Sequence, residues 1–392
     1  MEETVLILRG ARVAISATEA VRLDLAIGAG RIHDCSLHAK GRYVLNLDGF
    51  LILPGLINAH DHLDLNLFPR LGCGPYHNAT AWAEDIYRPN EPPIDRHLSV
   101  PKPVRLLWGC IKNLLSGVTS VAHHNPRHPV LRRSPIRVLT KFGWAHSQRF
   151  CSRWRENYRR TPAGVPFVIH AGEGTDEEAR SEIARMDAAH ALGPSTVLVH
   201  GVALDPPTLA LLCERGSSLI WCPSSNLFTL GRTLSPQVLR SDLPIALGTD
   251  SAITAQGNML DEISVASGFV DLTRVYQMVT TAPARMLNLP TGAGQIQENG
   301  PADLLVIRDE GKSPAAALLN CQPELVFVDG GLRLASADCA ERLSLQNLAP
   351  GHRIEIVERG RYLVDFDVPS LLEQTADTLG PEIRLAGKAV AA

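Results

Sequence analysis

The feature that most constrains the fold is an alternation of short apolar runs with amphipathic stretches, from about residue 53 to about residue 290. The apolar runs have the length of strands, and the stretches between them have the pattern of helices. Repeated strand–helix units of this kind form a parallel sheet. The strand candidates are LILPGLINAH, TSVAHH, IRVLTKFGWAH, PFVIHAG, TVLVHGV, SLIWCPSSN and PIALGTDS.

Polar residues end several of these strand candidates at a regular spacing. His62 and His170 are 108 residues apart, His170 and His200 are 30 apart, and His200 and Asp250 are 50 apart. These intervals are multiples of about 25 to 30 residues, which is the length of one unit of a (β/α)₈ barrel. Catalytic residues of such barrels lie at the carboxyl ends of the strands. We therefore predict an α/β fold with a (β/α)₈ TIM-type barrel, in which His60, His62, His170, His200 and Asp250 end strands 1, 1, 5, 6 and 8.

The first strand candidate ends in His60-Asp61-His62. Two histidines at positions i and i+2 of one strand point the same way, so both can reach one metal ion. Such a pair alone is weak evidence, since a strand-end histidine is more often a structural residue. The pair gains weight because the other strand-end residues are predicted to converge on the same barrel mouth.

The two ends of the chain differ from its middle. Residues 1–52 contain short β-rich runs separated by glycines and turns, and β-rich runs return after about residue 295. This pattern indicates antiparallel sheet. We predict one composite β-sandwich domain formed by both chain ends, with residues 1–52 as its first part, residues 53–294 as the catalytic barrel and residues 295–392 as its second part.

Composition excludes several classes of protein. The formal net charge is −3 and aromatic residues make up 5%, so nothing favours nucleic acid or an anionic membrane as a partner. The acidic start MEET is unlike a signal peptide, and no apolar run approaches the ~18 residues of a membrane span. Eight cysteines without a C-x-x-C pair disfavour a zinc ribbon and a disulfide framework. We expect a cytoplasmic protein that contacts no membrane.

A set of motifs occurs in one order: PGLINAHDH, VIHAGEG, LVHGVAL, CPSSN, LGTDS and TAPARMLNL, followed by GPADLLVI. Together they strongly resemble the metal-dependent amidohydrolase superfamily, in the branch of the cytosine, guanine and S-adenosylhomocysteine deaminases and the triazine hydrolases. The resemblance covers nearly the whole chain. It implies that His60, His62, His170 and Asp250 are the ligands of one zinc or iron ion.

The same resemblance gives roles to two further residues. Glu173, in His170-Ala-Gly-Glu173, matches the acid that moves protons, and His200 matches the residue that contacts the water or the substrate. A divalent ion lowers the pKa of a water that it holds, and a nearby carboxylate can take the proton and pass it to a ring nitrogen. The predicted catalytic residues are therefore Glu173, His200 and Asp250.

The number of metal ions depends on Lys141. Some binuclear relatives bridge two metals through a carbamylated lysine on the fourth strand, and Lys141 lies within the presumed fourth strand. It precedes His146 by five residues, which places it too deep in the barrel, and H-x-x-E on strand five is typical of the mononuclear branch. We expect one divalent metal ion, with zinc ahead of iron.

Candidate substrate contacts come from three segments. A long loop rich in Pro, Gly and aromatic residues follows the first strand and contributes Trp82, with Tyr76 and His77 as weaker candidates, since long loops at this face of a barrel build pockets. The presumed third strand ends in His123-His124-Asn125, where either histidine can line the pocket or cap the strand. The predicted substrate-binding residues are Trp82, His124, His146 and Arg149.

Charge is uneven around the presumed fourth strand. Residues 127–160 contain ten Lys or Arg and one acid, Glu156. We expect most of this charge to lie on solvated helix surface. His146 and Arg149 follow the strand and should lie near the barrel mouth. The alternative is therefore that part of this charge binds an anionic group on the substrate.

These observations predict a metal-dependent hydrolytic deaminase of a small amino-substituted N-heterocycle, of the purine, pyrimidine, pterin or triazine type, that releases ammonia. One alternative is an amidohydrolase that cleaves a cyclic amide or another C–N or C–Cl bond with the same metal site. A second is a barrel that binds a partner without catalysis. The H-x-E and P-C-x-x-C signature of zinc deaminases that act on nucleic-acid bases is absent, so we expect a free small molecule as the substrate. A homo-oligomer is left open.

Overall fold

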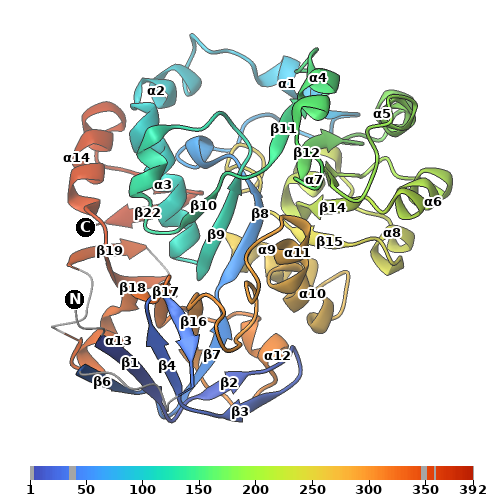
Figure 1. Ribbon diagram of the computed structural model, residues 1–392. Helices are drawn as coiled ribbons and strands as arrows, with labels where there is room; N and C mark the ends of the chain where they lie inside the picture. Colours follow the sequence, from blue (N-terminus) through green and yellow to red (C-terminus); the bar gives the residue numbers. More distant parts are fainter. Residues whose placement is uncertain (1–3, 35–40, 346–350, 357–358, 392) are drawn as a thin grey trace.

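The computed structural model describes residues 4–34, 41–345, 351–356 and 359–391 (Figure 1). It is a mixed α/β structure in which parallel strands and helices of the middle of the chain lie above β-rich layers formed by the two ends. Within these described ranges, none of the helices combines the length and the apolar character that a membrane span requires.

The middle of the chain contributes eight parallel strands in two hydrogen-bonded sheets, ordered β10-β9-β8 and β11-β12-β13-β14-β15. The backbone N–H of Thr249, just after β15, donates to the His60 carbonyl of β8 over 3.0 Å, so the two sheets meet there. This order is that of a TIM-barrel-type fold. The strands are β8 (Leu56–Asp61), β9 (Val118–His123), β10 (Arg137–Leu139), β11 (Gly143–Ser147), β12 (Phe167–Ala171), β13 (Thr196–His200), β14 (Ser218–Trp221) and β15 (Ile245–Leu247).

Hydrogen bonding does not close the ring between β10 and β11, for which the described residues show no strand pairing. Only residues 140–142 connect these two strands, and parallel neighbours need a crossover of a dozen or more residues. The prediction of one strand over IRVLTKFGWAH was therefore wrong, because the segment pairs first with β9 and then with β12. The prediction that His123-His124 ends the third strand was also wrong, since β9 is the second. Lys141 lies exposed in the β10–β11 connection rather than inside a strand.

Helices cover the outside of these strands, and several begin at side-chain caps that their sequences supply. In α6, for example, Asp205 and Thr208 form a capping box and Gly216, with φ of +70°, ends the helix. The elements between β8 and the end of the barrel region are η1 (Leu63–Leu65), α1 (Ala79–Ile86), α2 (Ile94–Ser99), α3 (Lys102–Leu114), η2 (Pro129–Arg133), α4 (Trp154–Arg160), α5 (Glu177–Ala188), α6 (Pro206–Arg215), α7 (Pro223–Leu230), α8 (Pro236–Arg240), α9 (Met259–Ala266), α10 (Leu272–Met278) and α11 (Thr281–Met286).

Both chain ends share a ten-stranded sheet, ordered β21-β22-β19-β20-β18-β17-β16-β7-β2-β3. Its junction is the antiparallel pairing of β7 with β16, in which Phe50 lies opposite Arg308 and Pro54 opposite Leu304. The strands are β2 (Arg12–Ala14), β3 (Ala20–Arg22), β7 (Phe50–Pro54), β16 (Leu304–Arg308), β17 (Leu325–Val328), β18 (Gly331–Ser336), β19 (His352–Ile356), β20 (Gly360–Val364), β21 (Arg384–Leu385) and β22 (Lys388–Ala391).

A second sheet of four strands, ordered β5-β4-β1-β6, lies beside the first. One buried cluster contains Leu8 and Ile27 of the four-stranded sheet together with Ile52 and Val306 of the ten-stranded sheet, so the two sheets share a hydrophobic core. The remaining elements are β1 (Thr4–Arg9), β4 (Leu25–Gly28), β5 (Arg31–His33), β6 (Gly41–Asn46), α12 (Pro314–Leu318), α13 (Ala337–Arg342) and α14 (Val368–Leu379).

Arg137 ties the barrel strands to the sheet formed by the chain ends. Its guanidinium on β10 forms ion pairs with Asp303, which directly precedes β16, and with Asp329, and it also donates to Ser120 Oγ on β9 over 3.0 Å. The guanidinium is largely buried, and Asp303 accepts a further bond from the Asp329 backbone N–H over 2.8 Å. The contact therefore joins three segments that are remote in sequence.

Replacing Arg137 with Met should lower the free energy of unfolding by about 2–3 kcal/mol, because the largely buried Asp303 loses its charged partner. Chemical denaturation followed by circular dichroism measures this change. The control is Arg22→Met, which removes the exposed Arg22–Asp48 pair and should leave stability unchanged. Equal effects of the two substitutions would contradict the assigned role of Arg137.

Candidate metal centre

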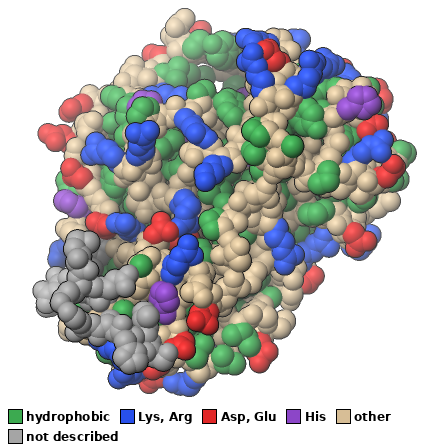
Figure 2. Space-filling model, viewed as in Figure 1, with side chains coloured by type: hydrophobic (Ala, Val, Ile, Leu, Met, Phe, Trp, Pro, Cys, Tyr) green, Lys and Arg blue, Asp and Glu red, His purple; other side chains and the backbone are tan. Residues whose placement is uncertain are grey.

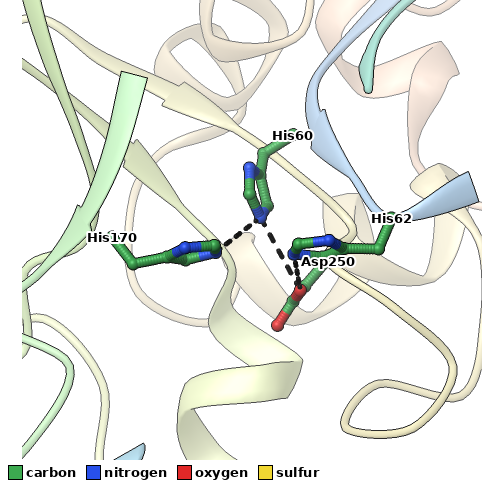
Figure 3. A group of neighbouring side chains, drawn as sticks. All are labelled: His60, His62, His170 and Asp250. Carbon is green, nitrogen blue, oxygen red and sulfur yellow. Dashed lines mark hydrogen bonds and ion pairs between the residues drawn. The ribbon is translucent and has the colours of Figure 1, made fainter. Parts of the chain in front are cut away.

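The four residues predicted as metal ligands lie together at the carboxyl ends of the parallel strands (Figure 3). His60 lies in β8 and His62 directly follows it, His170 lies in β12, and Asp250 follows β15. All four are buried, and each offers one ligand atom, with the four atoms within 4.8 Å of one another. The parallel direction of the strands thus brings together side chains up to 190 residues apart in sequence.

The distances between these atoms suit a single small cation. His60 Nε2 lies 3.2 Å from His170 Nε2 and 3.7 Å from Asp250 Oδ1, and His62 Nε2 lies 3.5 Å from the same carboxylate oxygen. Two nitrogens bound to one tetrahedral zinc at 2.0–2.1 Å are roughly 3.3–3.4 Å apart. Three imidazole nitrogens and one carboxylate oxygen are also a donor set that zinc and related divalent metals accept.

The histidines have the protonation state that metal binding requires. His170 Nδ1 lies 2.6 Å from the His146 carbonyl and donates to it, so His170 Nε2 is free of a proton and directs a lone pair at His60 Nε2. Burial lowers the pKa of His60 to about 4 and holds the pKa of His170 well below its usual value. Both imidazoles are therefore neutral near pH 7, as ligands must be. The residues present fit a divalent metal ion.

The backbone is strained where two of these strands end. His200 has φ of +79° and Asp250 has φ of +54°, in the left-handed region that residues other than glycine rarely adopt. Such conformations cost of the order of 1–3 kcal/mol each and cluster at functional sites. Gly172, with φ of +67°, makes the corresponding turn between His170 and Glu173, and it adopts that conformation without strain.

Two residues of the CPSSN segment hold site residues in place from α7. Ser225 Oγ donates to Asp250 Oδ2 over 2.6 Å, and Thr254 Oγ1 donates to the same oxygen over 3.1 Å. Asp250 Oδ1 is thereby left to face His60 and His62. Asn226 Oδ1 accepts from His200 Nδ1 over 2.8 Å, which fixes the orientation of that ring.

Glu173 faces His200 beside the ligand cluster. Its Oε1 lies 3.6 Å from His200 Nε2, and its side chain is only 16% exposed. Burial raises the pKa of Glu173 to about 7, against a lowering effect of His200. A carboxyl group with this pKa can both accept and release a proton near neutral pH.

A pocket of about 390 Å³ opens beside the cluster. It is lined in part by Asn78 and its neighbours at the start of α1, by His146, Arg149 and Phe150 after β11, and by Glu173 with the first turns of α5. Two of the four predicted substrate residues, His146 and Arg149, therefore line this pocket. Arg149 lies at its exposed rim, 3.8 Å from Glu84.

The other two predicted substrate residues lie outside this lining. Trp82 donates its indole N–H to the Leu71 carbonyl over 3.0 Å and so packs the loop that follows β8. His124 is buried behind the ligands, where its ring lies 4.6 Å from that of His170 and its Nε2 donates to the Ala145 carbonyl. Tyr76 bonds Asp85 within the same loop as Trp82, and His77 is exposed.

A buried hydrogen-bond network behind the cluster was not predicted from the sequence. Lys112 Nζ of α3 lies 2.8 Å from Asp61 Oδ2, and the two side chains are 3% and 0% exposed. Lys112 also donates to Asn66 Oδ1 and Thr249 Oγ1, and Asp61 accepts from Asn113 Nδ2 over 2.8 Å. Since Asp61 lies between His60 and His62, and Thr249 precedes Asp250, the network holds both ligand segments. The one local sign of this network in the sequence is Asp61, between His60 and His62. Because side chains alternate along a strand, Asp61 points to the face opposite the two histidines.

Comparison with known proteins shows what this chain is similar to. Residues 161–333 match the model of the amidohydrolase family, which confirms the resemblance predicted from the sequence. A 5-methylthioadenosine/S-adenosylhomocysteine deaminase of Syntrophobacter fumaroxidans is 25% identical over 389 residues, covering 81% of this chain and 86% of that protein. A protein of the same name from Pyrococcus furiosus is 25% identical over 359 residues, covering 73% and 82%.

Solved structures with the same fold include an adenosine deaminase of Xanthomonas campestris with bound zinc, with a TM-score of 0.67 and 18% identity over 95% of this chain and 97% of that one. A triazine hydrolase variant gives a TM-score of 0.72 and 15% identity over 95% of this chain and 99% of that one. These likenesses show the fold that the two structures share with this chain.

Replacing Lys112 with Met should lower the free energy of unfolding by about 3–5 kcal/mol, because Asp61 is left as a buried charge without a partner. Denaturant titration checks this loss. Lys102→Met, which removes a partly exposed pair with Asp64, should cost clearly less. A variant of Lys112 as stable as the wild type would show that the network does not hold the ligand segments.

Replacing Ser225 with Ala should weaken zinc binding about 10–100-fold, because Asp250 loses the bond that orients its carboxylate. Competition with a chromophoric chelator measures the affinity. Ser224→Ala is the matched control on the same helix, since Ser224 donates its backbone N–H to Glu262, a bond that alanine keeps, and the variant should retain the wild-type affinity. Equal affinities of the two variants would contradict the role of Ser225.

Proposed function

We propose that the protein, whose residues 161–333 match the amidohydrolase family, is a metal-dependent hydrolase that removes an amino group from a small N-heterocycle and releases ammonia. The observation that carries this proposal is the position of Glu173. A buried carboxyl group with a pKa of about 7 faces His200 beside four converging ligand atoms and lines the same pocket. Hydrolysis at an sp² carbon that bears an amino group needs such a proton carrier.

His60, His62, His170 and Asp250 would hold one divalent ion, with zinc ahead of iron. When bound, the ion acts as a Lewis acid that lowers the pKa of a water molecule. The protein's own groups supply the remaining steps. Glu173 takes a proton from the attacking water and transfers it to the ring nitrogen next to the reacting carbon. It then takes the second proton from the hydroxyl group that has added to this carbon, which becomes a carbonyl, and gives that proton to the amino group, which leaves as ammonia.

His200 is placed to stabilise the charge that develops on the substrate. Its Nδ1 donates to Asn226 Oδ1, which holds the ring so that Nε2 faces Glu173, beside the oxygen that adds to the reacting carbon. The 3.6 Å between His200 Nε2 and Glu173 Oε1 puts both groups within reach of one substrate atom. The strained backbone at His200 and Asp250 supports this assignment, because strain of this kind is retained where it serves function.

We propose further that the eight parallel strands form the barrel of residues 53–294 and that residues 1–52 and 295–392 form one composite β-sandwich. The pairing of β7 with β16 and the core that the two sheets share support this division. The strand order β10-β9-β8-β15-β14-β13-β12-β11, with the β8–β15 contact, supports the barrel.

The substrate in this proposal is a free small molecule, and 6-aminopurine nucleosides come first because the curated relatives carry the name of deaminases of two adenosine derivatives. Arg149 at the rim of the pocket favours a substrate with an anionic group. Aminopyrimidines, aminopterins and aminotriazines complete the set of candidate rings.

Replacing Glu173 with Gln should lower kcat/KM for ammonia release by about 10²–10⁴-fold, because the amide keeps the shape of the side chain but cannot carry a proton. A coupled ammonia assay on zinc- and iron-loaded protein across these four classes of ring measures it, with metal content determined in parallel. Glu177→Gln, at an exposed position four residues further along, should retain full activity.

The outcomes of this assay separate the alternatives. Metal uptake without ammonia release, but with hydrolysis of a cyclic amide or release of chloride, would replace deamination with the other C–N or C–Cl reaction. A purified protein that takes up neither zinc nor iron would favour a binding protein without catalysis. Equal activity of Glu173→Gln and the wild type would overturn the role of Glu173.

A further inference from the structure

The outer wall of the barrel strands lacks a helix between β10 and β11. The other connections between successive strands all contain helical structure, from α3 after β8 and η2 after β9 to α7 and α8 before β15. The β10–β11 connection has only residues 140–142. A strand–helix unit of ordinary length is therefore missing its helix at this place.

The strand before this connection, β10, is less buried than most of the other parallel strands. All three of its residues, Arg137, Val138 and Leu139, are half-buried. Every residue of β8, β9, β12, β13, β14 and β15 is buried. Val138 and Leu139 thus pack against the core but keep some exposure to solvent.

A depression of about 530 Å³ lies at the β10–β11 connection, and we call it the β10–β11 groove. Its apolar surface comes from Phe142, Trp144, Pro162 and Val165. Thr140, Gly143, Asn157 and Thr161 complete its lining together with three cationic side chains, Arg127, Lys141 and Arg160.

The surroundings of the groove are strongly basic. Arg127 and Lys141 of its lining and Arg159, the neighbour of Arg160, are exposed, and none of these three forms an ion pair within the described part of the chain. Glu156, the one acid of residues 127–160, is bonded by Arg153 and Arg160, each over 2.6 Å. Figure 2 shows several Lys and Arg side chains over the part of the molecule where β10 and α4 lie in Figure 1. The groove thus combines apolar side chains with two cations that form no ion pair in the described residues, Arg127 and Lys141, beside Arg160, which pairs with Glu156.

We propose that the β10–β11 groove binds an acidic amphipathic helix of another protein, in the place where the helix of a complete strand–helix unit would lie. An apolar stripe on such a helix would cover the floor of the groove, and its carboxylates would pair with the cations around it. Helix-in-groove recognition uses this combination, and arginine suits it because its fork matches a carboxylate.

Two other occupants fit less well. A second copy of this chain would bring one basic face against another, which is repulsive in a symmetric dimer. Single-stranded nucleic acid needs aromatic faces on which bases stack. The aromatic lining of the groove consists of Phe142 and Trp144, and both are half-buried, so they do not form a row of open rings for successive bases.

The test uses the full-length, metal-loaded protein and a fluorescein-labelled helical peptide of about 18 residues, with Leu along one stripe and Glu on the other face. A peptide with Lys in place of every Glu is the matched control. Fluorescence anisotropy should show binding of the Glu peptide that weakens with added salt, and at least about tenfold weaker binding of the Lys peptide.

The double substitution Lys141→Glu with Arg160→Glu should weaken binding of the Glu peptide at least about tenfold, and Arg127→Glu should act in the same direction. These side chains are exposed, so unchanged thermal stability is the check on folding. Arg180→Glu on α5, outside the groove, should bind as the wild type does.

Equal binding of the two peptides, or binding that the double substitution leaves intact, would overturn the proposal. Displacement of the Glu peptide by a single-stranded RNA that binds more tightly would also overturn it, in favour of a nucleic-acid partner.

Discussion

The buried ion pair of Lys112 with Asp61 is the interaction on which the metal centre depends most. It joins α3 to β8 and, through Thr249, to the segment that carries Asp250. The desolvation of two buried charges is costly, and here Asn66, Asn113 and Thr249 hydrogen-bond to the pair, so the network specifies one arrangement of its segments. The ligands therefore converge because a rigid polar layer lies directly behind them.

In front of this layer, burial controls the chemistry of the cluster. It keeps His60 and His170 neutral and raises the pKa of Glu173 to about 7, so the same desolvation prepares the ligands and the proton carrier. Hydrogen bonds then fix which atoms of Asp250 and His200 face the cluster. Ser225 occupies one oxygen of Asp250 and leaves the other for the cluster, and Asn226 orients His200. The CPSSN segment acts on the site through these two bonds.

The sequence allowed the ligand set and the parallel strands to be predicted because both depend on local order. Each ligand ends an apolar run, and the runs recur at the length of one strand–helix unit. Contacts between remote segments leave no such signal in the sequence. No residue near Lys112 indicates that its side chain pairs with Asp61. The apolar pattern of IRVLTKFGWAH is continuous, although the segment pairs first with β9 and then with β12. Aromatic content suggested Trp82 as a pocket residue, although its indole N–H serves the packing of its own loop.

The antiparallel pairing of β7 with β16 has a consequence for synthesis on the ribosome. Leu51 and Leu53 of β7 meet Ile307 and Leu305 of β16, and these partners leave the ribosome about 250 residues later. At about 5–20 residues per second, this delay lasts roughly 10–50 s, during which an apolar strand has no native neighbour on that edge. The nascent chain must therefore shield β7 by temporary contacts or by a chaperone, and the barrel strands emerge before the sheet that carries them can be completed.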